Sequence, residues 1–320
     1  MRAVFLGVLL MSCAHKPIRT EKLVPVADGS KIWVKSSEDS DIALPTAIYL
    51  HGGPGYNSYT FEKATSDVFR GKIRILFVDQ RGGAGRSELS ADADLSMQSI
   101  VKDIEEIRLT FGLEKVNLIG HSFGGIVALE YLRRYPNTSG KIILVDISAD
   151  LIAAFNYQVN RALEVAQVAF PQHKEALSRI TASGEAPSKK LDSVYSLVGR
   201  VPLQRQLLFV SDLIQAKQEA WDEESGLQEK AAGIPGKLYA GLVKAGYLDS
   251  HHEELLQKVQ VPAVLFAGSQ SHCIGPANIA KASRDWGIPV KWFERSGHFV
   301  YADEPEKFTA EVEKFLREYP

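Results

Sequence analysis

The sequence predicts an α/β protein: a mostly parallel β-sheet with helices on both faces, interrupted by an all-helical insertion. Short continuous apolar runs alternate with segments of helical periodicity, as expected when strands are buried on both faces. Such alternation predicts parallel strands joined by covering helices. Between residues 150 and 257 helical patterns continue without a strand pattern, which predicts the insertion. A chain of 320 residues, 45% of them hydrophobic, is long enough to bury a large core.

The first residues are predicted to be a targeting segment rather than part of the fold. In MRAVFLGVLLMSC, one basic residue precedes an apolar run too short to span a bilayer, which fits a secretory signal at residues 1–12. The ending LMSC resembles a bacterial lipobox, which implies lipidation of Cys13 and a tether over residues 13–21. A lipid anchors a chain without making it span the membrane. The expected location is therefore the bacterial cell envelope, facing the periplasm or the cell exterior; a misassigned start or a short uncleaved anchor is the alternative.

The strands and helices of the core are predicted in chain order over residues 22–149 and 258–320. A β-type rhythm opens the core in KLVPVADG and KIWVKSS, with a turn at DG. Clear helices are predicted at residues 97–112 and 305–320, where apolar residues recur at helical spacing. The buried strands are predicted within TAIYLHGG, RILFVDQ, KVNLIGHS, KIILVDIS, VPAVLFAG and VKWFERSG. We interpret residues 150–257 as a helical cap over a functional site; a helical layer without a functional role is the alternative.

The segment VNLIGHSFGG combines the end of a buried strand, a tight turn and the start of a helix. Gly120 and Gly124 flank Ser122, which matches the G-x-S-x-G pattern in the strand–turn–helix context that it requires. Glycines leave room for backbone crowding that a Cβ would block. The N-terminus of the following helix favours a developing oxyanion. We predict that Ser122 is a nucleophile; a purely structural turn is the alternative.

A second glycine-rich turn, HGGPG, follows the strand TAIYL. It could be a turn that only ends the strand, or it could present backbone N–H groups to an anion. Paired with the Ser122 turn, it suits an oxyanion hole formed by the N–H groups of Gly53 and Phe123.

A serine nucleophile needs a base, and the base is predicted to be a histidine late in the chain. In SGHFVYADEPEKF, His298 lies directly after the last predicted strand and before the final helix. His121 lies within the serine turn, whereas His251 and His252 lie at the end of the predicted cap. A packing or surface role for His298 is the alternative.

Taken in order, HGGPG, DQRGGAGRS, GHSFGG and GHFVYADEPEKF resemble the α/β-hydrolase superfamily, and more narrowly its prolyl aminopeptidase (proline iminopeptidase) group. The resemblance covers residues 24–150 and 261–320. It implies the α/β-hydrolase fold: an eight-stranded, mostly parallel sheet, a helical cap after the sixth strand, and a triad in the chain order Ser, Asp, His.

The sequence departs from the pattern of that group in three places. The DQRGGAGRS loop is one residue longer than the usual form. The cap lacks the glutamate-bearing motifs that hold a substrate's amine, and the nearest material, AWDEES with Asp222, is interpreted as a solvated face. The third departure is the acid, because Ser271 occupies the usual acid position and a serine cannot carry the charge that supports the histidine.

Three interpretations of the acid stay open. Asp146, at the end of KIILVD, could supply it, in the position that haloalkane dehalogenases use. The site could instead work as a Ser122–His298 dyad, with a water or Ser271 supporting the histidine. The third interpretation is a non-catalytic hydrolase fold kept for binding.

The resemblance implies a serine hydrolase that cleaves an ester or amide bond through an acyl-enzyme, most simply a prolyl-aminopeptidase-like enzyme acting on a small molecule or short peptide. A carboxylesterase acting on small acyl esters and a non-catalytic binding lipoprotein are the alternatives. No cofactor or metal is predicted, because no cluster in the sequence has the spacing of metal ligands. Nucleic acid is not an expected partner, since the net charge is −2 and there is no basic block. Membrane contact is expected only through a lipid on Cys13.

Overall fold

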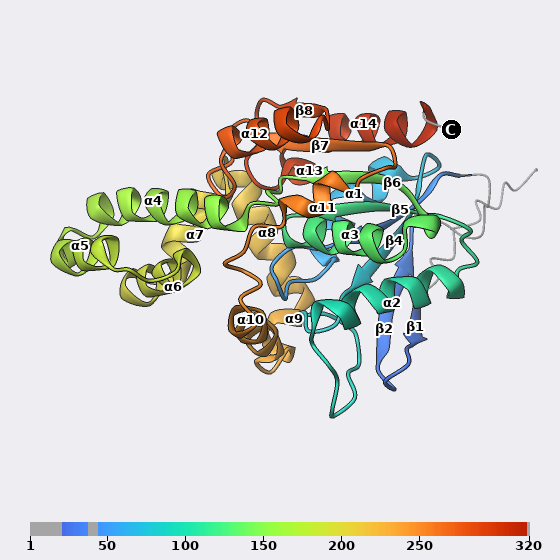
Figure 1. Ribbon diagram of the computed structural model, residues 1–320, viewed down its shortest axis with the longest axis horizontal. Helices are drawn as coiled ribbons and strands as arrows, with labels where there is room; N and C mark the ends of the chain where they lie inside the picture. Colours follow the sequence, from blue (N-terminus) through green and yellow to red (C-terminus); the bar gives the residue numbers. More distant parts are fainter. Residues whose placement is uncertain (1–20, 38–43, 319–320) are drawn as a thin grey trace, which may run out of the picture.

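The computed structural model describes residues 21–37 and 44–318, and Figure 1 traces the chain from the first strand to the last helix. The predicted signal at residues 1–12, the predicted lipid on Cys13 and all but the last residue of the predicted tether lie outside the described residues and remain predictions. Among the helices that are described, none combines the length and the apolar character needed to cross a bilayer.

Within the described residues, eight strands form one sheet in the order β1-β2-β4-β3-β5-β6-β7-β8. Strand β2 pairs antiparallel with both β1 and β4, and every other pair is parallel. This confirms the predicted mostly parallel sheet. The strand bounds are β1 (Glu21–Pro25), β2 (Lys31–Ser36), β3 (Thr46–Leu50), β4 (Arg74–Asp79), β5 (Val116–His121), β6 (Ser139–Val145), β7 (Ala263–Gly268) and β8 (Val290–Phe293).

Helices cover both faces of the sheet, which explains why the central strands are continuously apolar. Successive residues of one strand serve opposite clusters: in β3, Ile48 packs in one apolar cluster and Tyr49 in the other. The first face is covered by α2 (Met97–Thr110), α3 (Phe123–Arg134), α11 (Glu253–Gln257) and α12 (Pro276–Trp286). The second face is covered by α1 (Tyr59–Phe69), α13 (Val300–Asp303) and α14 (Pro305–Glu318).

The two clearest predicted core helices are present with their apolar faces buried. In α2, Ile100, Ile104 and Ile107 are at most 2% exposed. In α14, the predicted stripe packs against the second face of the sheet through Phe308 and Val312, both fully buried.

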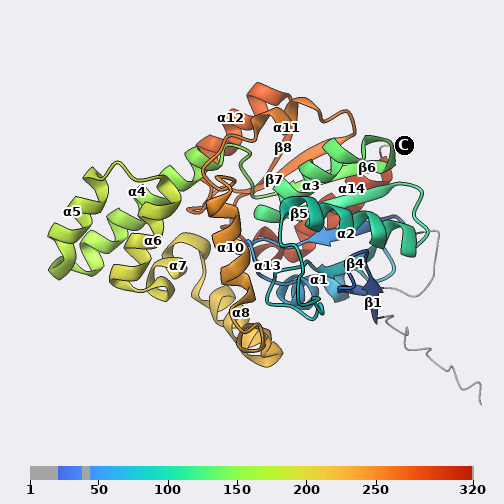
Figure 2. The same cartoon turned by 60° about the horizontal axis from the view of Figure 1, so that its bottom comes forward.

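Between β6 and β7 the described chain is helical, and we call residues 150–257 the cap. Its first helices share an apolar cluster of their own, to which Val159, Leu177 and Val194 belong. Figures 1 and 2 show α4 to α7 projecting beyond the sheet, while α8 and α10 lie closer to the strands. The cap helices are α4 (Leu151–Ala169), α5 (Lys174–Ala182), α6 (Pro187–Val198), α7 (Arg200–Leu208), α8 (Asp212–Ser225), α9 (Leu227–Lys230), α10 (Ile234–Lys244) and α11.

Candidate active site

Ser122 lies on a sharp turn between β5 and α3. Its backbone has φ 53°, a left-handed conformation that is costly for a residue with a side chain. The turn is possible because of its neighbours: a Cβ on Gly124 would lie 2.1 Å from the carbonyl oxygen of Leu50. Ser122 stays partly exposed between buried neighbours, so its hydroxyl lies at the end of the strand where a substrate could reach it.

The HGGPG turn lies directly against this serine, since a Cβ on Gly52 would be 2.8 Å from Ser122 Cβ. Gly53 is the next residue of that turn. Phe123 is the first residue of α3, so its N–H is one of those that have no partner within the helix. The structure therefore places the two predicted oxyanion donors in segments that flank Ser122.

His51 fixes the HGGPG turn to the loop after β4. Its Nε2 accepts the backbone N–H of Gln80 at 3.0 Å, so Nδ1 carries the proton and donates to the carbonyl of Gly52 at 2.9 Å. Burial lowers the pKa of His51, which keeps the ring neutral. The Gln80 side chain also donates to the carbonyl of His51 at 2.8 Å.

The DQRGGAGRS loop, residues 79–87, is held by its own buried carboxylate. Burial raises the pKa of Asp79, but hydrogen bonds and charge from Arg86, with help from Ser58, outweigh burial and lower it. Asp79 Oδ2 accepts from Arg86 Nε at 2.7 Å, and Oδ1 accepts from the Ser58 hydroxyl at 2.6 Å. The loop therefore ties α1 and the HGGPG turn to the sheet.

His298 and Asp146 meet at the carboxyl ends of the strands. His298 Nδ1 lies 2.6 Å from Asp146 Oδ2, and both side chains are buried. Asp146 follows β6 directly and has φ 47°, a conformation that aspartate tolerates better than most residues. Ser271 does not contact His298 through a hydrogen bond within the described residues; its hydroxyl donates instead to Asp146 Oδ2 at 2.6 Å.

The surroundings of His298 favour a charged ring. Burial by itself lowers the pKa of His298, but the neighbouring Cys273 side chain and the Asp146 carboxylate raise it above the ordinary imidazole value. Cys273 is buried and its Sγ accepts a hydrogen bond from Gln158 of the cap at 2.9 Å. Within the described residues Ser122 donates no hydrogen bond to His298, a contact that in such sites commonly tightens only when substrate is bound.

His121 links the serine turn to the histidine loop, a role that the sequence analysis missed. Its Nε2 donates to the carbonyl of His298 at 2.9 Å, and the two rings lie 4.6 Å apart. Burial and the neighbouring His298 hold the pKa of His121 well below the ordinary value, so the ring is neutral and can donate. From the cap, the carbonyl of Leu208 accepts the backbone N–H of His298 at 3.2 Å.

The structure corrects the interpretation of AWDEES as a solvated face for Asp222 alone. Asp222 of α8 is partly buried, and its Oδ1 accepts the Tyr56 hydroxyl at 2.5 Å, immediately after the HGGPG turn. Burial raises the pKa of Asp222. Glu223 and Glu224 are exposed, and Glu224 pairs with Lys63 of α1. A cap carboxylate therefore does reach the loop beside the candidate site.

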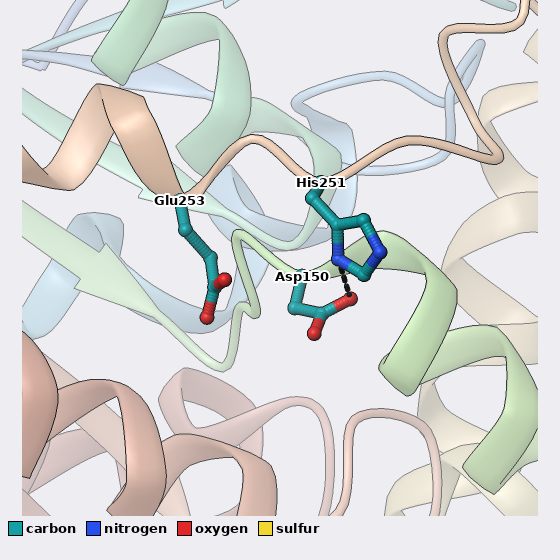
Figure 3. A group of neighbouring side chains, drawn as sticks. All are labelled: Asp150, His251 and Glu253. Atoms are coloured by element: carbon teal, nitrogen blue, oxygen red, sulfur yellow. Dashed lines mark ion pairs between the residues drawn. The ribbon is translucent and has the colours of Figure 1, made fainter.

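Three side chains that could hold a metal ion meet where the cap joins the core. Asp150, His251 and Glu253 each offer one ligand atom within 4.8 Å of the others, and Figure 3 shows them converging from two segments of the chain. The sequence analysis missed this group because Asp150 and His251 lie at opposite ends of the cap. These atoms already have partners: His251 Nδ1 is 2.9 Å from Asp150 Oδ1, which also accepts the Ala153 N–H, and Lys281 donates to Glu253 at 3.0 Å.

The chain belongs to the α/β hydrolase fold family, whose model matches residues 45–305. It is similar to a proline iminopeptidase of Lactobacillus helveticus, with 22% identity over 86% of this chain and 90% of the relative. A proline iminopeptidase of Saccharolobus solfataricus is 24% identical over 84% of each chain.

Solved structures show the same fold. A proline iminopeptidase-related protein from Thermus thermophilus superposes with a TM-score of 0.71 at 24% identity, over 93% of this chain and 97% of that one. An esterase from Exiguobacterium antarcticum superposes with a TM-score of 0.63 at 21% identity, over 92% of this chain and 98% of that one. The predicted resemblance to α/β hydrolases of the prolyl aminopeptidase type is thus confirmed, and a hydrolase enzyme is what these relatives indicate.

Proposed function

We propose that the protein is a serine hydrolase that cleaves an ester or amide bond through an acyl-enzyme on Ser122. The observation that carries the proposal is the 2.6 Å contact between His298 Nδ1 and Asp146 Oδ2, at the strand ends beside a serine held at φ 53°. This contact supports Asp146 over the unsupported dyad as the source of the acid. It also removes the main reason for a non-catalytic binding protein, which was a missing aspartate.

The reaction follows from these positions. Ser122 Oγ attacks the carbonyl carbon while His298 Nε2 takes its proton, and Asp146 stabilises the imidazolium that forms. The N–H groups of Gly53 and Phe123 hold the oxyanion of the tetrahedral intermediate. His298 then gives the proton to the leaving group as the carbonyl–leaving-group bond breaks. Water, deprotonated by the same histidine, attacks the acyl-enzyme and releases the acid and the free serine.

For the substrate, we propose an aminoacyl compound with a free amine, such as a small peptide with an N-terminal proline. The relatives named proline iminopeptidase support this class. Asp222 gives a physical reason, because a partly buried carboxylate beside the HGGPG turn could meet an ammonium group next to the scissile carbonyl. A carboxylesterase is the second candidate, supported by the esterase with the same fold.

A fluorophosphonate probe tests the proposed chemistry, because it phosphonylates an activated serine. We expect the wild-type chain to react at Ser122, and we expect Ser122→Ala and His298→Ala to fail to react while circular dichroism shows that they stay folded. A folded wild-type chain that does not react would contradict the proposal.

The substrate class is tested separately, with L-proline p-nitroanilide and p-nitrophenyl acetate. A free-amine substrate should be preferred in kcat/KM over the same anilide with an acetylated proline nitrogen. If the acetylated compound is cleaved equally well, the amine is not recognised. If p-nitrophenyl acetate is hydrolysed and neither anilide is cleaved, the esterase candidate takes the place of the aminopeptidase.

A further inference from the structure

We infer that Ser271 is a positioning residue for the candidate acid: its hydroxyl, together with the Gly268 N–H, locks the Asp146 carboxylate so that Oδ2 faces His298. The inference rests on the proposed function, because it assigns Ser271 to the same site. Ser271 lies in the turn after β7, whereas Asp146 follows β6, so the acid is supported from the neighbouring strand end.

Each oxygen of the Asp146 carboxylate accepts a hydrogen bond from a different donor. Gly268 N donates to Asp146 Oδ1 at 3.2 Å, and Ser271 Oγ donates to Oδ2 at 2.6 Å. The terminal torsion of an aspartate is broad and weakly restrained by itself. One donor on each oxygen removes that freedom, so the plane of the carboxylate is held independently of His298.

The contact of His298 with Asp146 explains why the orientation of the carboxylate would matter for the reaction. Ser271 Oγ and His298 Nδ1 both lie 2.6 Å from the same oxygen, Asp146 Oδ2. Asp146 is 1% exposed and Ser271 fully buried, so water does not replace a lost donor easily. The donor that orients the carboxylate therefore acts on the same oxygen that contacts His298.

A structural role alone is the competing explanation, because a buried hydroxyl needs an acceptor wherever it lies. The two explanations differ in what the loss of the hydroxyl changes. A structural serine would affect stability and leave turnover of the folded enzyme unchanged. A positioning serine would lower kcat with little change in KM, since the carboxylate supports charge that forms only during the reaction.

The test compares Ser271→Ala with Ser269→Ala in the full chain, using fluorophosphonate labelling and p-nitrophenyl acetate hydrolysis. Ser269 lies in the same turn, and its hydroxyl donates to the carbonyl of Glu294, away from Asp146. We expect Ser271→Ala to lose about 10-fold in kcat at nearly constant KM, the order expected for one hydrogen bond to a charged group. We expect Ser269→Ala to match the wild type.

The outcomes separate the inference from the proposed function. If the wild type fails to label, both are overturned. If the wild type labels and Asp146→Asn is slow, but folded Ser271→Ala matches Ser269→Ala, only the inference about Ser271 is overturned. A loss of kcat in Ser271→Ala, with KM nearly constant and Ser269→Ala unchanged, supports it.

Discussion

The sheet and the cap contribute to the candidate site in different ways. The sheet contributes Ser122 and Asp146 directly at strand ends, in strained backbone conformations held by buried contacts. The cap contributes Asp222 and Gln158 from helices, through side-chain contacts to Tyr56 and Cys273 that are only partly buried. The strand ends therefore place Ser122 and Asp146 through the backbone itself, whereas Asp222 and Gln158 contribute through their side chains. We therefore expect sheet residues to control the rate for every substrate and cap residues to control the choice among substrates.

The largest expected effect concerns Asp146, one of the residues that the sheet contributes. Asp146→Asn should lower kcat by about 10³–10⁴ for both the prolyl anilide and the acetate ester, as loss of the acid does in serine proteases. KM should change little, because Asp146 is buried behind the histidine. Steady-state kinetics with both substrates measure this. A loss confined to one substrate would break the division between sheet and cap.

A smaller effect, confined to one substrate, is expected for Asp222, which the cap contributes. Asp222→Asn should lower kcat/KM for the free-amine anilide by about 10- to 100-fold, because a charged hydrogen bond to the ammonium is lost. Hydrolysis of p-nitrophenyl acetate should stay within about twofold. Glu223→Gln, at an exposed position on the same helix, is the matched control and should change neither rate. Equal losses on both substrates would mean that Asp222 acts by holding Tyr56.

The pH dependence of the labelling rate tests the contact between His298 and Asp146. His298 must be neutral to accept the serine proton, so the labelling rate should rise with pH, with a midpoint above the ordinary imidazole pKa of about 6.5. The Asp146 carboxylate raises the pKa of His298 and burial lowers it, so Asp146→Asn should move the midpoint to lower pH. Cys273→Ser measures the contribution of the other neighbour that raises this pKa. A midpoint that moves upward in Asp146→Asn would contradict the assignment.

The smallest expected effect concerns His251, which lies where the cap joins the core. His251 is mostly exposed, so His251→Ala should cost at most about 1 kcal/mol of unfolding free energy, as measured by denaturant titration. Added Zn²⁺ should leave the melting temperature of the wild type unchanged, because His251 already pairs with Asp150 and Lys281 with Glu253. A clear rise in melting temperature with Zn²⁺, lost in His251→Ala, would instead establish a metal site at the cap joint.

Much of the fold could be predicted because the core strands are locally distinctive. A continuous apolar run such as KIILVD indicates a strand that is buried on both faces. The glycines around Ser122 indicate a crowded backbone, and the structure shows this crowding directly. The contact between Asp146 and His298 could not be predicted in the same way. It depends on the pairing of β6 with β7, which brings the turn at Gly268 and Ser271 against the end of the neighbouring strand.

The cap resisted prediction for a different physical reason. Helical periodicity predicts a helix at α8, but its buried residues are the polar Gln215 and Gln218, so the segments that contact it depend on long-range packing. Asp222 and Glu224 are two residues apart, yet one contacts Tyr56 and the other pairs with Lys63. The partners of both lie more than a hundred positions earlier in the chain, so no local pattern reports them.

The link between Asp150 and His251 has a consequence for how this architecture can change. The chain leaves the core and returns to it at paired residues, and His252 N donates to the carbonyl of Ala149 at 2.8 Å. An inserted segment whose ends already touch can be lengthened at little entropic cost to its host, because closure entropy grows only slowly with loop length. The two ends of the cap therefore lie close enough that the cap can change in length while the core strands on either side of it stay in place.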